Sequence, residues 1–137
     1  QLQSSAASDV YKRQAKRYAM EGAKVVVSAR TVNEEDHYLP GSISQTVNEI
    51  KEAGGEALAV KANLALPEDR ANLIDATTDE FGFVDILVNN AAITYFTPVA
   101  DFTTKHYDLM LEVQVRAPFE LTQWFYLACV NRAPVGF

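Results

Sequence analysis

The stretch that decides the fold is residues 84–92, which read Val84-Asp85-Ile86-Leu87-Val88-Asn89-Asn90-Ala91-Ala92. It is a short apolar run that ends in two amides and two small residues. The run follows a turn that contains Gly82, and this pattern predicts a strand over 84–88 that is buried on both faces of a parallel sheet. Ligands of open α/β sheets bind at the carboxyl ends of the strands. We therefore expect a ligand to approach the backbone closely just after this strand.

The same order of helix, glycine and strand occurs three times along the chain. Strand patterns over 23–29 and 57–62 each follow a helical pattern that ends at glycine, first at Gly22 and then at Gly54. A third helix opens at Pro67, ends at Gly82 and precedes the 84–88 strand. Three such units with short turns predict right-handed crossovers and a parallel sheet. In the first unit, Asp9 is the expected N-terminal cap of the helix.

After a loop over 93–100, a long helix is predicted from about residue 103 to residue 127. Its apolar residues are too numerous for one narrow stripe, so we expect the helix to be covered on more than one side. Either further chain or a partner subunit can provide that cover. Pro118 lies inside the helix and lacks a backbone donor, which predicts a local bend.

The composition fits one globular domain of 137 residues with an ordinary hydrophobic content of 48%. A net charge of −6 and a pI near 4.8 argue against a nucleic-acid surface. No apolar run is long enough for a membrane helix, and Cys129 is the single cysteine. We therefore expect a soluble cytoplasmic protein without a metal site. The polar insert 31–42, which holds three acids and His37, is expected to be a solvated surface excursion.

Residues 85–92 (D-I-L-V-N-N-A-A) resemble the D-x-L-V-N-N-A-G signature of the short-chain dehydrogenase/reductase family, with Ala92 at the usual glycine. The resemblance runs from about residue 15 to about residue 125. It implies an α/β fold with a Rossmann-like, doubly wound parallel sheet. It also implies hydride transfer between a nicotinamide cofactor and a small carbonyl or alcohol substrate, in a homo-oligomer that pairs through the 103–127 helix.

The resemblance also implies which residues hold the cofactor. Arg30, at the end of the second strand of the family, can form a fork-like pair with a 2′-phosphate, and Ala29 stands where NAD-preferring relatives carry Asp. NADP is therefore the expected cofactor rather than NAD. The adenine edge is assigned to Asn63 and the adenine ring to Leu64. The ribose and phosphates are assigned to Asn90, Ala91 and Ala92.

Two departures from the family lie toward the ends of the chain. The Gly-rich turn that holds the pyrophosphate is expected near residues 4–12, but that stretch has no glycine, and the apolar first strand is absent. We therefore divide the chain into a patternless, truncated or non-native start at 1–13 and a partial dinucleotide-binding domain at 14–137. The predicted sheet is incomplete, with its first and C-terminal strands missing.

The second departure concerns catalysis. No Tyr has a Lys four residues later, and the last serine is Ser44, so the family's Tyr, Lys and Ser are not in this sequence. The catalytic Asn position on the long helix is held by Gln114, whose reach is longer by one methylene. The leading interpretation is part of an NADP-dependent oxidoreductase that is inactive as an isolated chain. The alternatives are a non-catalytic nucleotide-binding or protein-interaction module, and a cloning fragment without a function of its own.

Overall fold

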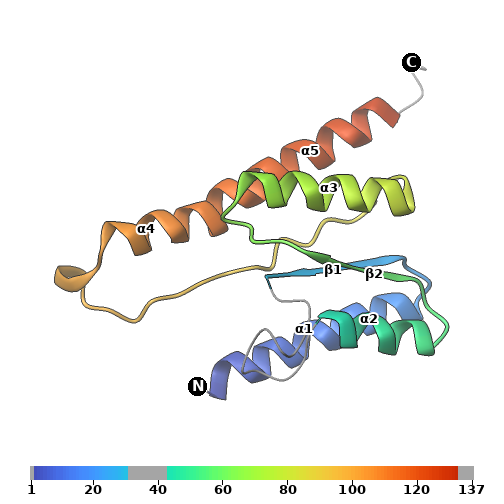
Figure 1. Cartoon of the computed structure of the whole chain (residues 1–137), viewed down its shortest axis with the longest axis horizontal. Helices are drawn as coiled ribbons and strands as arrows, with labels where there is room; N and C mark the ends of the chain where they lie inside the picture. Colours follow the sequence, from blue (N-terminus) through green and yellow to red (C-terminus); the bar gives the residue numbers. More distant parts are fainter. Residues whose placement is uncertain (1, 31–42, 133–137) are drawn as a thin grey trace.

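The computed structural model describes the backbone of residues 2–30 and 43–132, with side chains over 10–30 and 43–130 (Figure 1). Its sheet consists of β1 (Val25–Ala29) and β2 (Ala57–Lys61), which pair in parallel from Val25 opposite Ala57 to Ala29 opposite Lys61. The helix α2 (Ile43–Glu52) precedes β2 and packs on both strands. The first two predicted strands and their parallel arrangement are confirmed.

Helices lie on both faces of this sheet. The helices α1 (Leu2–Met20) and α2 cover one face, and α3 (Pro67–Phe81) covers the other face. A long helical rod, residues 104–132, lies beyond α3 (Figure 1). This is the doubly wound α/β arrangement, built here around two strands within the described residues. The predicted fold class and the incompleteness of the sheet are both confirmed.

The main apolar core lies between the α1–α2 layer and the sheet. Ile50 on α2 is 2% exposed and packs with Val47, Ala19 on α1 and Ala57 on β2. Val47 and Ile50 are three residues apart and therefore share one face of α2. This face explains why α2 docks on the sheet, since its other side is polar and exposed.

Two of the predicted glycine stops illustrate why the helices end where they do. Gly54 (φ 85°) follows α2 and Gly82 (φ 80°) follows α3, both in the left-handed region that side chains with a Cβ rarely adopt. The N–H of Gly82 donates to the carbonyl of Thr78 at 2.7 Å and so satisfies one of the last carbonyls of α3.

The long helix is confirmed as a rod of three consecutive segments, α4 (Thr104–Leu111), the π-helical turn η3 (Glu112–Arg116) and α5 (Ala117–Arg132). Thr103 caps α4, because its side chain accepts a hydrogen bond from the N–H of His106. The irregularity expected at Pro118 takes the form of η3. Proline cannot donate to the preceding turn, and a π turn just before it changes the hydrogen-bond ladder.

Two predictions about local structure are wrong. The segment 84–88 forms no strand in the described chain, and Ile86 is 78% exposed. A strand needs a hydrogen-bonded neighbour, and both strands of the sheet are paired only with each other. Asp9 does not cap the first helix, because α1 begins at Leu2 and runs through it.

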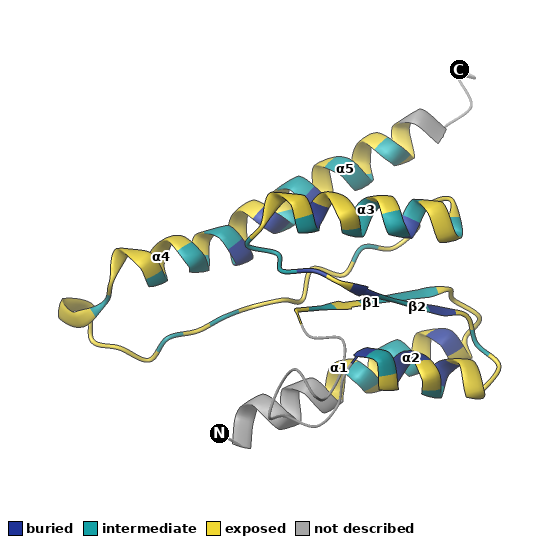
Figure 2. Cartoon of the chain, in the orientation of Figure 1, coloured by how far each residue is buried: buried dark blue, intermediate teal, exposed yellow. Residues whose placement is uncertain are grey.

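The segment between α3 and α4 is extended, apart from the short 3₁₀ helix η2 (Val99–Asp101). Figure 2 shows that most of this segment is exposed. The insert 31–42 lies outside the described residues, so its predicted role is not tested. Since α1 runs without a break across residue 13, the division of the chain there also stays a prediction. Among the described helices, none is long and apolar enough to cross a membrane.

Candidate functional site

Three of the predicted cofactor-binding residues lie at one edge of the sheet. Arg30 follows β1 directly, and Asn63 and Leu64 follow β2. The N–H of Ala62 donates to the carbonyl of Ala29 at 3.0 Å, so the chain leaves both strands at neighbouring points. Arg30 is exposed, whereas Asn63 and Leu64 are half-buried. The parallel register therefore places Arg30 and the loop that carries the Asn63 amide at the same end of the sheet.

The loop after β2 is held by its own hydrogen bonds. The backbone N–H of Asn63 donates to Oδ2 of Asp69 at 2.7 Å, and Oδ1 of Asn63 accepts from the N–H of Ala65 at 3.2 Å. The N–H of Leu66 closes the turn on the carbonyl of Asn63 at 2.8 Å. Because Oδ1 is engaged in this turn, the amide nitrogen of Asn63 is the group that can donate to a base edge.

Asn90, Ala91 and Ala92 lie in the exposed, extended segment that follows α3. Figure 1 shows this segment running in the same direction as β1 and β2 before it continues to α4. Its position is tied by Asn89, whose Nδ2 donates to Oγ1 of Thr122 on α5 at 3.2 Å. Asn89 therefore joins the segment after α3 to a helix.

Gln114 lies in η3 and is half-buried. The turn places it between Glu112 and Arg116, whose side chains pair with each other at 2.9 Å. Val113 next to it is buried in the rod's packed face. π-helical turns inside α-helices are frequent at functional sites, and this one contains the residue at the family's Asn position.

The most buried charged side chain in the described chain is Arg70, which sequence reasoning did not single out. Its Nη1 donates to the carbonyl of Leu64 at 2.6 Å and to Oε1 of Glu112 at 3.0 Å. Its Nε donates to Oε2 of Glu120 at 2.8 Å. The sequence feature that could have identified Arg70 as buried is its position on α3, where it shares a helical face with half-buried Leu73 and Ile74.

Tyr95, just past the 85–92 signature, packs in an aromatic cluster. Its ring stacks on His106 at a centroid distance of 4.0 Å, and Phe102 packs edge-on against both rings. Phe96, the next residue, is exposed. His106 is half-buried by this stack. No group of three His, Cys, Asp or Glu within the described ranges is placed to hold a metal ion.

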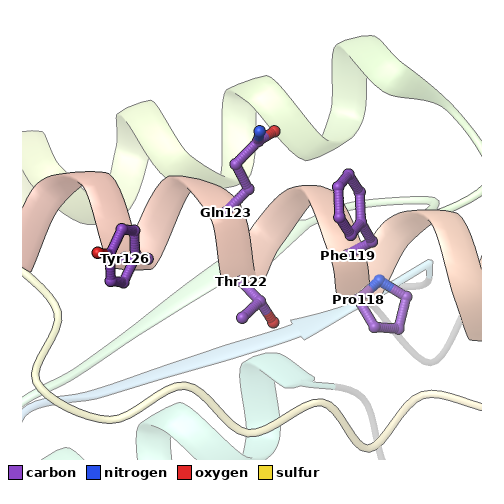
Figure 3. Close-up of a pocket in the computed structure, with 5 residues that line it drawn as sticks. All are labelled: Pro118, Phe119, Thr122, Gln123 and Tyr126. Atoms are coloured by element: carbon purple, nitrogen blue, oxygen red, sulfur yellow. The ribbon is translucent and has the colours of Figure 1, made fainter.

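The described pocket lies on α5. It is a shallow, open depression of about 460 Å³ lined by Pro118, Phe119, Thr122, Gln123 and Tyr126 (Figure 3). None of the predicted cofactor-binding residues lines it. Phe119 and Tyr126 are each 65% exposed. A depression of this form fits contact with another surface better than it fits enclosure of a nucleotide.

Comparison with known proteins agrees with this geometry. Residues 6–134 match the short chain dehydrogenase family. Hydroxysteroid dehydrogenase-like protein 2 from Bos taurus is 36% identical over 101 residues, which cover 74% of this chain and 24% of the bovine protein. The solved structure of a short chain dehydrogenase from Mycobacterium thermoresistibile is 34% identical with a TM-score of 0.76, covering 86% of this chain and 42% of that one.

A metagenomic short-chain oxidoreductase solved in complex with NADP is 28% identical with a TM-score of 0.73, covering 85% of this chain and 50% of the other. The chain thus spans about a quarter of the curated relative and no more than half of the two solved proteins. The match to the family covers most of the sequence and includes the strand ends that carry Arg30 and Asn63 and the extended segment that carries Asn90. This chain belongs to the short-chain dehydrogenase family.

Proposed function

We propose that this chain provides the adenosine- and 2′-phosphate-binding part of an NADP-dependent short-chain oxidoreductase. The observation that carries the proposal is the placement of Arg30 next to the Asn63–Leu64 loop at the carboxyl ends of two paired parallel strands. The edge beyond parallel strands is where open α/β sheets bind nucleotides.

The chemistry of this edge favours NADP over NAD. Arg30 presents a planar guanidinium that can donate two parallel hydrogen bonds to a phosphate. Ala29, directly before it, adds no carboxylate that would repel the phosphate or accept from a ribose hydroxyl. Asn63 offers its amide nitrogen to the adenine edge, and Leu64 lies in the same turn. A relative of similar fold was solved with NADP bound, which supports this assignment.

Asn90, Ala91 and Ala92 serve the ribose and phosphate part of the same cofactor. Their small side chains leave the exposed backbone open to a ligand. The reaction of the whole enzyme is hydride transfer between NADP and a small carbonyl or alcohol substrate. Its place in the cytoplasm is supported by the single cysteine, and the net charge of −6 supports a small-molecule substrate over nucleic acid.

The isolated 137-residue chain binds nucleotide without turning over substrate. It has no Tyr with Lys four residues later and no Ser beyond Ser44 to supply the acid–base pair and the carbonyl-binding hydroxyl. Gln114 is the residue at the Asn position, and its half-buried place in η3 gives it an orienting role at most in this chain.

A second function, protein interaction, is favoured by the rod. The residues Val115, Phe119, Tyr126 and Val130 are all exposed and follow one another at helical spacing. They lie on the opposite side of the rod from the buried residues Val113, Ala117 and Leu121. An exposed apolar stripe of this length marks a contact surface, and pairing with a second copy of the chain through this helix is the form proposed.

The test of the nucleotide proposal is a titration of the purified chain with 2′,5′-ADP and with 5′-AMP. Wild-type protein is expected to bind 2′,5′-ADP more tightly. Arg30→Gln is expected to remove most of that preference, by about tenfold or more, because it deletes a charge-assisted phosphate contact. Arg17→Gln is the matched control, since it removes the same charge from the exposed face of α1. Equal affinity for both nucleotides in the wild type would overturn the proposal.

A further inference from the structure

The strongest unassigned feature is the network around Arg70 near the start of α3. Arg70 is 2% exposed, and its guanidinium donates three hydrogen bonds to three different segments. These segments are the turn after β2, through Leu64, the π turn η3, through Glu112, and α5, through Glu120. One side chain therefore connects the nucleotide edge of the sheet with the helical rod.

The charges of this network are balanced. Two cations, Arg70 and Arg116, face two carboxylates, Glu112 and Glu120, and Glu112 accepts from both cations. The carboxylates are partly solvated, with side chains 26% and 40% exposed, whereas Arg70 is enclosed. The attraction of the two carboxylates offsets part of the desolvation penalty of burying the Arg70 guanidinium. The Nη2 of Arg70 has no hydrogen-bond partner among the described residues.

Two consecutive residues of α3 hold the loop that carries the predicted adenine contacts. Asp69 accepts the backbone N–H of Asn63 at 2.7 Å, and Arg70 donates to the carbonyl of Leu64 at 2.6 Å. One N–H and one carbonyl of this stretch of backbone are thereby bonded to side chains of α3. The conformation of the turn, and with it the direction of the Asn63 amide, depends on these two contacts.

We propose that Arg70 is a positioning residue for adenine binding, acting through the carbonyl of Leu64. This inference rests on the proposed nucleotide-binding function of the Asn63–Leu64 turn. Glu112 and Glu120 set the orientation of the guanidinium, and Arg70 sets the turn. The same contacts link the turn to η3. A change in the conformation of the turn therefore acts, through Arg70, on Glu112, which lies two residues before Gln114.

One variant distinguishes the positioning role of Arg70 from a purely structural role of the ion network. Replacing a whole buried ion network by apolar residues of similar volume is often neutral for stability, whereas removing one partner is costly. The triple variant Arg70→Met, Glu112→Leu, Glu120→Leu keeps apolar packing between α3 and the rod. It also removes the hydrogen bond to the Leu64 carbonyl. Stability and loop positioning are therefore separated in this variant.

The experiment compares wild type, Arg70→Met, the triple variant and the control Arg116→Gln in the full 137-residue chain. Arg116→Gln removes an exposed cation of the same network without touching Leu64. Two quantities are measured: the amide exchange rates of Ala65 and Leu66, whose N–H groups close the turn, and the affinity for 2′,5′-ADP.

In the triple variant, the turn amides are expected to exchange about tenfold faster, and 2′,5′-ADP is expected to bind about tenfold more weakly, at near wild-type stability. Arg116→Gln is expected to change neither quantity. Unchanged turn exchange in a folded triple variant overturns the positioning role, whatever the nucleotide result. Faster turn exchange together with no 2′,5′-ADP binding by wild type supports the control of the turn by Arg70 and instead overturns the proposed nucleotide function.

Discussion

Asn89 and Thr122 are joined by a hydrogen bond of 3.2 Å from the side-chain amide to the hydroxyl, and this contact ties the segment after α3 to α5. Asn89 belongs to the stretch that defines the family by sequence, yet its neighbours Val88 and Asn90 are exposed and lie outside the sheet. The rod therefore helps to hold the segment that carries Asn90, Ala91 and Ala92, the residues that we propose to bind the ribose and phosphates.

Thr122→Val tests this tether, because valine keeps the shape of threonine and removes the acceptor. The amides of 86–92 are expected to exchange about two- to tenfold faster, which corresponds to the loss of one hydrogen bond worth about 0.5–1.5 kcal/mol. Hydrogen exchange followed by mass spectrometry on the peptides of this segment measures the effect. Thr122→Ser keeps the hydroxyl and is expected to behave like wild type. Equal amide exchange rates in Thr122→Val and Thr122→Ser would show that the hydrogen bond to Thr122 does not hold the segment in place.

The C-terminal ends of the first three helices were predictable because they depend on local chemistry. Gly22, Gly54 and Gly82 mark the ends of three helices, and each adopts the positive φ that the sequence pattern demands. The two paired strands were predictable from the short apolar runs that follow these stops, rich in valine in β1. The choice of Arg30 and Asn63 as site residues came from the family resemblance, and parallel pairing explains why the segments that carry them leave the sheet at the same end.

The rest depended on partners that no local pattern reveals. The apolar run 86–88 has strand chemistry, but a strand exists only when a neighbour accepts its hydrogen bonds, and Ile86 is left exposed without one. Arg70 reads as an ordinary helical arginine until Glu112 and Glu120, 42 and 50 residues later, are placed beside it. Long-range ion pairs of this kind have no sequence period.

Gly55→Ala tests the packing of α2 against α1. A Cβ at this position would lie 2.9 Å from Cγ2 of Ile50 and 3.2 Å from Cβ of Ala19, both in the buried core. Because these atoms cannot move far, the variant is expected to lose about 1–3 kcal/mol of unfolding free energy. Urea denaturation measures it. Ala53→Ser, on the exposed side of the same turn, is the control and is expected to stay within about 0.5 kcal/mol of wild type. A fully stable Gly55→Ala protein would refute the described packing.

The ion pair of Glu49 with Lys16 links α2 to α1 and predicts a dependence of stability on pH. The hydrogen bond from Lys16 is the main cause that lowers the pKa of Glu49 below its ordinary value of 4.5, helped by the charge of Lys16 and by Gln45 and Lys12, while desolvation opposes it. Because the pKa is lower in the folded chain, the stabilising contribution is complete above pH 4.5. It is lost as the pH falls through the folded value.

Glu49→Gln is therefore expected to be less stable than wild type at neutral pH, and the difference is expected to shrink as the pH falls to about 3. Thermal denaturation across this range measures both proteins. Glu52→Gln, an exposed change on the same helix, is the control for the loss of one negative charge. A difference between Glu49→Gln and wild type that is independent of pH would exclude the ion pair as its source.

The exposed stripe on the rod predicts an oligomer that depends on Phe119. Val115, Phe119, Tyr126 and Val130 are all exposed on the rod, and Phe119 also lines the depression on α5 (Figure 3). Two copies that pair through this stripe bury the apolar side chains, whereas a lysine at its centre would have to lose its hydration at the interface. Phe119→Lys is expected to convert a dimer to a monomer, as measured by light scattering after gel filtration. Asn48→Lys adds the same charge at an exposed position of α2 and is expected to leave the mass of the dimer unchanged. A wild-type monomer, or a Phe119→Lys protein with the wild-type dimer mass, would show that the stripe is not the contact between copies.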